Sequence, residues 1–258
     1  MALLGFSDRT NAWQGALASL DDGAHGGMPF LLAWLQKESD GNPCSFTKYH
    51  EAGIWQLMPG SLTSDGGGDL AKAGTTVSEQ HPVPPCTAGT QTSASISDLT
   101  SDQIAAQVSA GTTYLNYCID MVQTALQNNG SPIDQTNPDF WRFVKLVHAA
   151  PAWVKNGIGL VSQQLGAPVS SWDDFESTAI SLGCWGSQHC TDSLANARSV
   201  GAYGGSDPQP SIEDQLIVLA GPQTALSAGE IALVALASLA GMAGAVYFER
   251  WLTRRKAA

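Results

Sequence analysis

Charged residues are scarce in this sequence, and basic ones are the scarcest. Asp, Glu, Lys and Arg make up 14% of the 258 residues, with 12 Lys and Arg against 23 Asp and Glu, so the net charge is −11. A chain this acidic lacks the basic face that neutralises phosphates, so we expect no nucleic acid among its partners. Hydrophobic residues, at 43%, still suffice for the packed core of one ordinary domain.

The N-terminus lacks the pattern of a cleavable signal peptide. Its first residues, MALLGFSDRTNAW, contain no basic stretch followed by a long apolar one. The sequence therefore predicts no export signal of the usual kind.

Charge is absent altogether between Ile231 and Phe248. An apolar run of about 20 residues spans the hydrocarbon core of a membrane. Trp251 stands where an aromatic belt would lie, and three Arg and one Lys follow Glu249. We therefore predict a transmembrane helix over residues 224–249, with the lipid bilayer as a partner. A helix buried in a protein core is the alternative.

Cysteine is also rare, and its number is odd. The chain has five of them: Cys44, Cys86, Cys118, Cys184 and Cys190. At least one is therefore free or paired with another chain. Cys184 and Cys190 are close enough in sequence for a small disulfide loop. The alternative, a metal site formed with His189, lacks a fourth ligand, so we expect no metal and no cofactor.

Apolar periodicity predicts a mainly α fold. Prolines suit the first turn of two helices, and an apolar stripe marks a long one, with Ser101 as its N-cap. We expect helices at about residues 29–39, 101–127, 138–147 and 172–183. Only residues 54–58 resemble a strand.

Stretches rich in Gly, Pro, Ser and Thr divide the chain. One is a long loop insertion and another is a linker before the apolar run. The predicted parts are an N-terminal segment 1–23, a domain 24–203 with the insertion 60–97, a linker 204–223, the span 224–249 and a basic tail 250–258.

One carboxylate is expected in apolar surroundings. Trp34, Leu35 and Glu38 follow Leu31 at helical spacing, which puts Glu38 on the apolar face near the end of its helix. Burial and the negative end of the helix dipole both raise the pKa of a carboxyl group. We expect Glu38 to stay protonated near neutral pH and to donate a proton. A solvated side chain at a frayed helix end is the alternative.

Two short segments near Glu38 occur at a defined spacing. Residues 38–43 are ESDGNP and residues 52–59 are AGIWQLMP. Together they resemble the first two motifs of the soluble lytic transglycosylase catalytic domain, which is similar to goose-type lysozyme. The resemblance implies a lysozyme-like α-helical domain with a minimal strand and loop region, and it covers roughly residues 24–205.

The third motif of that family, Tyr-Asn-Ala-Gly-Pro, is matched in part. Residues 147–151 are Val-His-Ala-Ala-Pro. Val147 replaces the tyrosine whose hydroxyl contacts the catalytic acid in the family, and His148 replaces the asparagine. Tyr203 is one candidate for the missing hydroxyl.

The resemblance implies a peptidoglycan lytic transglycosylase. Glu38 would protonate the bond between N-acetylmuramic acid and N-acetylglucosamine and then act as a base, leaving a 1,6-anhydro end. The implied substrate-binding residues are Ser39, Gly53, Trp55, Gln56, His148 and Ala149. Trp55 would stack on a sugar ring or pack in the core, and Ser39 would also fix the loop.

Two other functions remain open on the sequence. A lysozyme-type hydrolase of the inverting kind needs a second carboxylate to activate water, for which Glu51 and Asp65 are candidates. A non-catalytic glycan-binding or structural protein on the same fold is the other alternative. The altered third motif favours it, whereas the intact Glu-Ser and Gly-x-x-Gln patterns favour the enzyme more.

Topology suggests where such an enzyme would work. Residues 1–249 carry 8 Lys and Arg and all 23 Asp and Glu, a net charge of −15, whereas the last nine residues carry +4. Positive flanks stay in the cytoplasm, so we expect the body outside it. A body outside the cytoplasm with no visible export signal suits a bacteriophage virion protein that opens the host wall during infection. Other virion proteins or further copies of this chain are then expected partners.

Overall fold

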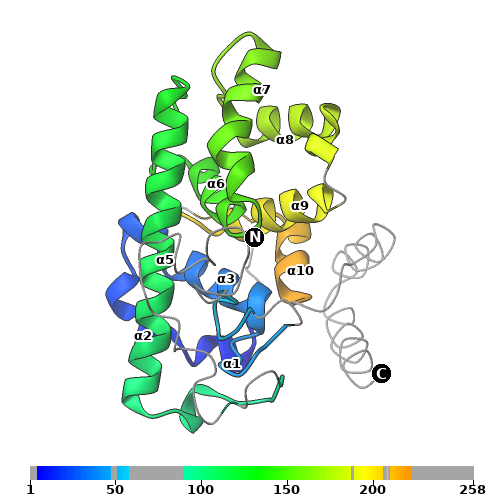
Figure 1. Cartoon of the computed structure of the whole chain (residues 1–258). Coiled ribbons are helices and arrows are strands. Elements are labelled where there is room, and N and C mark those ends of the chain that lie inside the picture. The colour runs from blue at the N-terminus through cyan, green and yellow to red at the C-terminus, as the bar shows by residue number, and fades with distance from the viewer. Residues whose placement is uncertain are drawn as a thin grey trace.

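The structure is a computed structural model that describes residues 5–47, 51–57, 86, 90–186, 189–205, 208 and 210–221. Helices account for most of this part of the chain (Figure 1). The α-helices are α1 (Asp8–Asn11), α2 (Gln14–Leu17), α3 (Met28–Ser39), α5 (Ser101–Asn128), α6 (Pro138–Ala149), α7 (Ile158–Leu165), α8 (Trp172–Ser181), α9 (Cys190–Gly201) and α10 (Ile212–Leu219). Shorter turns of helix are η1 (Ala18–Leu20), η2 (Gly23–His25), η3 (Ile96–Asp98), the π-helical η4 (Trp153–Gly157) and η5 (Gly183–Gly186).

The prediction of a mainly α fold is confirmed, but the predicted strand is wrong. Residues 51–57 form a tight turn with isolated bridges from Ala52 to Phe46 and to Leu57. A strand needs a neighbour to pair with along its length, and the described residues supply none here. The turn instead packs against α3 and α5 through buried Ile54 and Trp55.

Helix α3 lies in the middle of the other helices (Figure 1). It begins as expected, with Pro29 in its first turn, and ends where Asp40 turns left-handed at φ 55°. Its residues from Phe30 to Gln36 are all buried, because helices or loops cover it on several sides. A buried helix of this kind places any polar side chain near its end next to other elements rather than in open solvent.

Helices α5 and α6 follow α3 in the chain. The capping residue of α5 is Thr100 rather than Ser101, and it forms a capping box with Gln103. Helix α6 begins at Pro138 with Asn137 as its N-cap, as the sequence predicts for a proline in the first turn. Helix α6 packs against α5 and α9, and α9 also contacts α3.

Two predicted boundaries do not match the structure. The N-terminal segment 1–23 is part of the folded body, because Trp13 and Leu17 are fully buried and Trp13 donates a hydrogen bond to the carbonyl of Gly41 at 2.9 Å. The predicted linker 204–223 contains α10, which packs against α3 and α9. A capping box formed by Ser211 and Asp214 starts this helix.

The predicted transmembrane helix 224–249, the basic tail and most of the insertion 60–97 lie outside the described residues. Within the described part of the chain, no helix is both long enough and apolar enough to cross a bilayer.

Two disulfides join pairs of cysteines. Cys184 pairs with Cys190, one of the two arrangements that the sequence left open, and Cys44 pairs with Cys86. The fifth cysteine, Cys118, is buried in α5. The disulfide after α3 ties the segment that follows Glu38 to residue 86, at the far end of the insertion.

Candidate functional site

The end of α3 and one face of α6 bring three ionisable side chains together. The carboxylate of Glu38 forms an ion pair with the ammonium of Lys145, and Nδ1 of His148 lies 3.4 Å from the same carboxylate oxygen. The Lys145 side chain is 1% exposed, that of His148 7% and that of Glu38 16%. The candidate acid is therefore the part of this cluster most accessible from outside.

Burial alone would raise the pKa of Glu38, as the sequence predicts. Burial is the largest single influence, but Lys145 and His148 act together in the opposite direction through charge and hydrogen bonds, and their sum outweighs burial. The pKa of Glu38 is therefore held well below its ordinary range. The expectation that Glu38 stays protonated near neutral pH is wrong for this arrangement, because the resting side chain is a carboxylate.

A chain of hydrogen bonds fixes His148. The ammonium of Lys145 lies 3.0 Å from Nδ1, and the carbonyl oxygen of Gln56 lies 3.2 Å from Nε2. An ammonium only donates, so Nδ1 accepts and Nε2 carries the proton that goes to Gln56. The turn at 51–57 is thus joined to α6 beside Glu38.

The turn residues that the resemblance singled out act mainly within the protein. Ser39 is 3% exposed and donates to the carbonyl of Ile54 at 2.9 Å, which fits the expected role in fixing the loop. Gln56 is 2% exposed, and its amide nitrogen donates to the carbonyls of Ser45 and Gly53. Gly53 is also buried and has a φ of 76°. These side chains shape the turn and do not face a substrate in this arrangement.

Gln56 itself has an uncommon backbone conformation. Its φ is 50°, in the left-handed region that non-glycine residues rarely adopt. The carbonyl of this strained residue is the one that receives the His148 proton. Its side-chain oxygen Oε1 is buried with no hydrogen-bond partner. Strain and an unsatisfied polar atom at one residue are more typical of functional sites than of plain scaffold.

Trp55 packs in the core and does not offer its ring to a sugar. It is 3% exposed, and its indole nitrogen donates to the carbonyl of Gln107 on α5 at 3.0 Å. A Cβ at Gly111 would lie 2.1 Å from the indole ring, so this glycine is needed for the close approach. Of the two roles left open for Trp55, the structure shows core packing.

The remaining predicted residues lie in different surroundings. Ala149 is exposed at the end of α6, next to His148, whereas Val147 is fully buried. Tyr203 does not supply the missing hydroxyl, because its OH is buried without a hydrogen-bond partner. Burial and the nearby charge of Asp214 raise the pKa of Tyr203. Of the residues predicted for the site, the structure therefore brings Glu38, His148 and the backbone of Gln56 together.

Sequence reasoning missed Lys145 and Tyr114. Lys145 lies one helical turn before His148 and on the same face of α6, which was a visible signal. Its ammonium also lies 4.8 Å from the centre of the Trp34 ring, a cation–π contact. The Tyr114 ring on α5 lies 5.8 Å from that of His148. The His148 ring therefore contacts α3 through Trp34 and α5 through Tyr114.

Glu51 and Asp65 are the candidates for a second carboxylate. Glu51 accepts a hydrogen bond from Thr47 at 2.9 Å, and Asp65 lies outside the described residues. Within the described ranges, no three His, Cys, Asp or Glu side chains are grouped so as to hold a metal ion. Cys184 and Cys190 are bonded to each other, which removes them from the metal site considered with His189.

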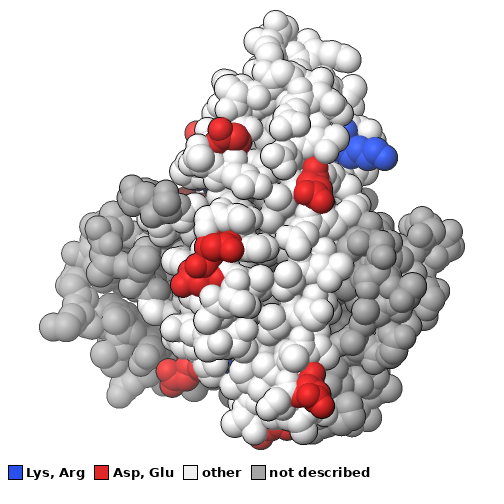
Figure 2. All heavy atoms as spheres, turned by 90° about the vertical axis from the view of Figure 1, so that its left-hand side faces the viewer, with Lys and Arg blue, Asp and Glu red and all other residues white. Residues whose placement is uncertain are grey.

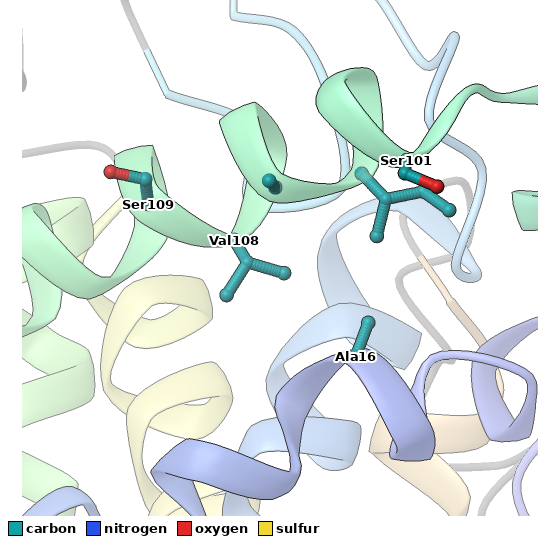
Figure 3. A pocket seen from close by; sticks show the side chains of 6 residues that line it. Ala16, Ser101, Val108 and Ser109 are labelled. Atoms are coloured by element: carbon teal, nitrogen blue, oxygen red, sulfur yellow. The ribbon is translucent and has the colours of Figure 1, made fainter.

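A separate hollow lies between α2 and the first half of α5 (Figure 3). Its lining is apolar except for the hydroxyls of Ser101 and Ser109, with Ala16 and Val108 facing each other across it. It holds no acid or base. The face on the α5 side of the molecule carries scattered acidic side chains and little basic charge (Figure 2), so it offers few partners to an anionic ligand.

Comparison with known proteins identifies no family for this cluster. No protein-family model, no curated protein and no solved structure matches the chain.

Proposed function

We propose that this protein is a peptidoglycan lytic transglycosylase with Glu38 as its acid and then its base. One observation supports the proposal more than any other. The three segments that carry the resemblance, 38–43, 52–57 and 147–151, are far apart in sequence but meet at one partly exposed carboxylate. The mainly helical architecture is also what a lysozyme-like domain requires.

The proposed reaction needs one carboxyl group. Protonated Glu38 gives its proton to the glycosidic oxygen between N-acetylmuramic acid and N-acetylglucosamine as the bond from that oxygen to the anomeric carbon breaks. The N-acetyl carbonyl of the substrate stabilises the positive charge on that carbon. The muramic 6-hydroxyl then bonds to the anomeric carbon and returns its proton to Glu38. The product ends in a 1,6-anhydro ring, and Glu38 is protonated again.

The Cys44–Cys86 and Cys184–Cys190 disulfides support a site of action outside the cytoplasm. Disulfides persist in oxidising compartments and are rare in the cytosol. With the predicted span at 224–249, we propose a membrane-anchored virion protein that opens the host cell wall locally during infection. Virion proteins or further copies of the chain are the proposed partners.

A non-catalytic glycan-binding protein is the second candidate. The Glu38–Lys145 ion pair favours it, because a carboxylate held by a buried ammonium is common in purely structural pairs. Such a protein would bind glycan strands without releasing product.

The test uses the full chain in detergent with purified sacculi over an acidic to neutral pH range. We expect soluble muropeptides whose mass is lower by one water than that of a hydrolysed end, and no release by Glu38→Gln. Equal and negligible release by both proteins, together with retained binding to sacculi, would overturn the enzyme in favour of the binding protein. Products of the hydrolysed mass would show a lysozyme-type hydrolase instead.

A further inference from the structure

We infer that Lys145 is a positioning residue that restrains the proposed reaction: its ammonium keeps Glu38 in the carboxylate form until that contact is broken. This inference rests on the proposed function, because it assigns a proton-donor role to Glu38. It adds a residue that the resemblance does not include and a condition under which the site works.

The side chains around Lys145 enclose its ammonium next to Glu38. The side chain is 1% exposed, and its Nζ contacts the Glu38 carboxylate, His148 Nδ1 and the face of the Trp34 ring. A buried charge is costly unless it is paired and hydrogen-bonded. The carboxylate is the only negative partner that the described structure gives this ammonium. The ion pair is therefore the reason that a lysine is tolerated here.

His148 directs the ammonium toward Glu38. Its Nε2 proton is committed to the Gln56 carbonyl, so Nδ1 remains an acceptor facing Lys145. The ring is also packed against Trp34 and Tyr114, with ring centres 5.4 and 5.8 Å away. The imidazole therefore cannot turn away without losing these contacts, and it holds the lysine in its place.

Glu38 can act as an acid only when its carboxyl group carries a proton. An ionised carboxylate has no proton to give to a leaving oxygen, whereas a buried neutral one has. The pKa of Glu38 is low because Lys145 and His148 together outweigh burial; without Lys145, only His148 opposes burial, so that pKa rises. Substrate must therefore displace the ammonium, or the solution must be acidic, before Glu38 can act.

Apart from Lys145 and His148, the ionisable groups around the cluster are not among those that lower the pKa of Glu38. Lys37 neighbours Glu38 on α3, but its ammonium donates to the carbonyls of Ile217 and Gly221 near the end of α10, each at 3.2 Å. Asp192 of α9 acts on Lys37 rather than on Glu38. Tyr114 of α5 meets the cluster through its ring contact with His148. Lys37 is thus a matched control: it is also a lysine next to Glu38, but it is bonded elsewhere.

The experiment compares Lys145→Met with Lys37→Met in the full chain in detergent. Muropeptide release is measured against pH, and the titration of the Glu38 carboxyl is followed by carbon NMR with Glu38→Gln to assign its signal. We expect the Glu38 titration in Lys145→Met to move up by at least about one pH unit, and release near neutral pH to rise about tenfold or more. Lys145→Arg, which keeps the charge, and Lys37→Met should both retain the wild-type profile.

The outcomes separate the two claims. An unchanged pH profile and titration in Lys145→Met, with product still formed, would overturn the restraint but not the enzyme. Loss of release in Lys145→Met alone would also overturn it and would make Lys145 the source of the proton. No product from any variant at any pH would overturn the proposed function. If Lys145→Met fails to fold, Lys145→Gln serves with the same expectations.

Discussion

The hydroxyl of Ser39 donates a hydrogen bond to the carbonyl oxygen of Ile54 over 2.9 Å. The bond joins the last residue of α3 to the 51–57 turn. Glu38 immediately precedes the donor, and Gln56 follows the acceptor by two residues. This buried bond is therefore one of the contacts that hold the candidate acid near the carbonyl that binds His148.

Removing this bond should loosen the turn. We expect Ser39→Ala to lower the free energy of unfolding by about 1–3 kcal/mol, because the Ile54 carbonyl loses a buried donor. Thermal unfolding followed by circular dichroism measures the change. Ser199→Ala is the control: Ser199 is also buried, but its hydroxyl bonds the carbonyl of Ala195 in its own helix. Equal losses from both variants would contradict a special role for the bond between Ser39 and Ile54.

A methyl group at Gly111 should displace Trp55. The added Cβ would lie 2.1 Å from the indole ring, so the ring or the α5 backbone must move. We expect Gly111→Ala to destabilise the protein by about 1–3 kcal/mol and to weaken muropeptide release. Gly15→Ala, in α2 with nothing near its added Cβ, should instead be neutral or stabilising by up to about 1 kcal/mol. Denaturant unfolding of the two variants compares them, and a stable Gly111→Ala protein would count against the packing described here.

The two disulfides should differ in what their loss costs. Cys44 and Cys86 are 42 residues apart, whereas Cys184 and Cys190 are 6 apart. Loop-closure entropy gives about 4 kcal/mol for the first pair and about 2 kcal/mol for the second. We expect the double alanine variant at 44 and 86 to melt at the lower temperature of the two. The reverse order would show that the longer loop is already restricted in the unfolded chain.

Stability should depend on pH through Glu38. Its pKa is lower in the folded protein than the ordinary value of about 4.3. A lowered folded pKa contributes stability that is present above the unfolded value and is lost as the pH falls below it. We expect Glu38→Gln to be destabilised near neutral pH by up to about 3 kcal/mol, because buried Lys145 loses its counter-charge. The difference from wild type should shrink in acid.

A double variant checks the origin of that loss. Replacing both members of a buried ion pair by apolar residues is often neutral. Glu38→Leu combined with Lys145→Met should therefore be more stable near neutral pH than Glu38→Gln alone. Unfolding curves at several pH values measure both, and a double variant as unstable as the single one would place the effect elsewhere than in the pair.

The sequence predicts the local parts of the fold well. Prolines 29 and 138 mark the first turns of α3 and α6, and helical spacing places Glu38 on a face that is indeed largely covered. These features depend on neighbours in the chain, which a sequence pattern records directly. The capping box of Ser211 and Asp214 was an equally local signal, inside a stretch taken for a linker.

The parts that the sequence mispredicted or left open depend on residues far apart in the chain. The sign of the Glu38 pKa shift is set by Lys145, 107 residues away, together with His148, and a helical wheel of α3 contains no information about α6. Trp55 was assigned to a sugar or to the core with equal weight, and its contacts with Gln107 and Gly111 on α5 decide for the core. The pairing of Cys44 with Cys86 likewise follows from the fold and not from spacing.

The hydrogen bonds of Lys37 have a mechanical consequence. Its ammonium donates hydrogen bonds to the carbonyls of Ile217 and Gly221. Gly221 is the last residue that the structure describes. A force applied to the chain after Gly221 would act on these hydrogen bonds. Their donor, Lys37, is the residue immediately before Glu38. The end of the described chain is therefore joined to α3 by Lys37 in addition to the packing of α10 against α3.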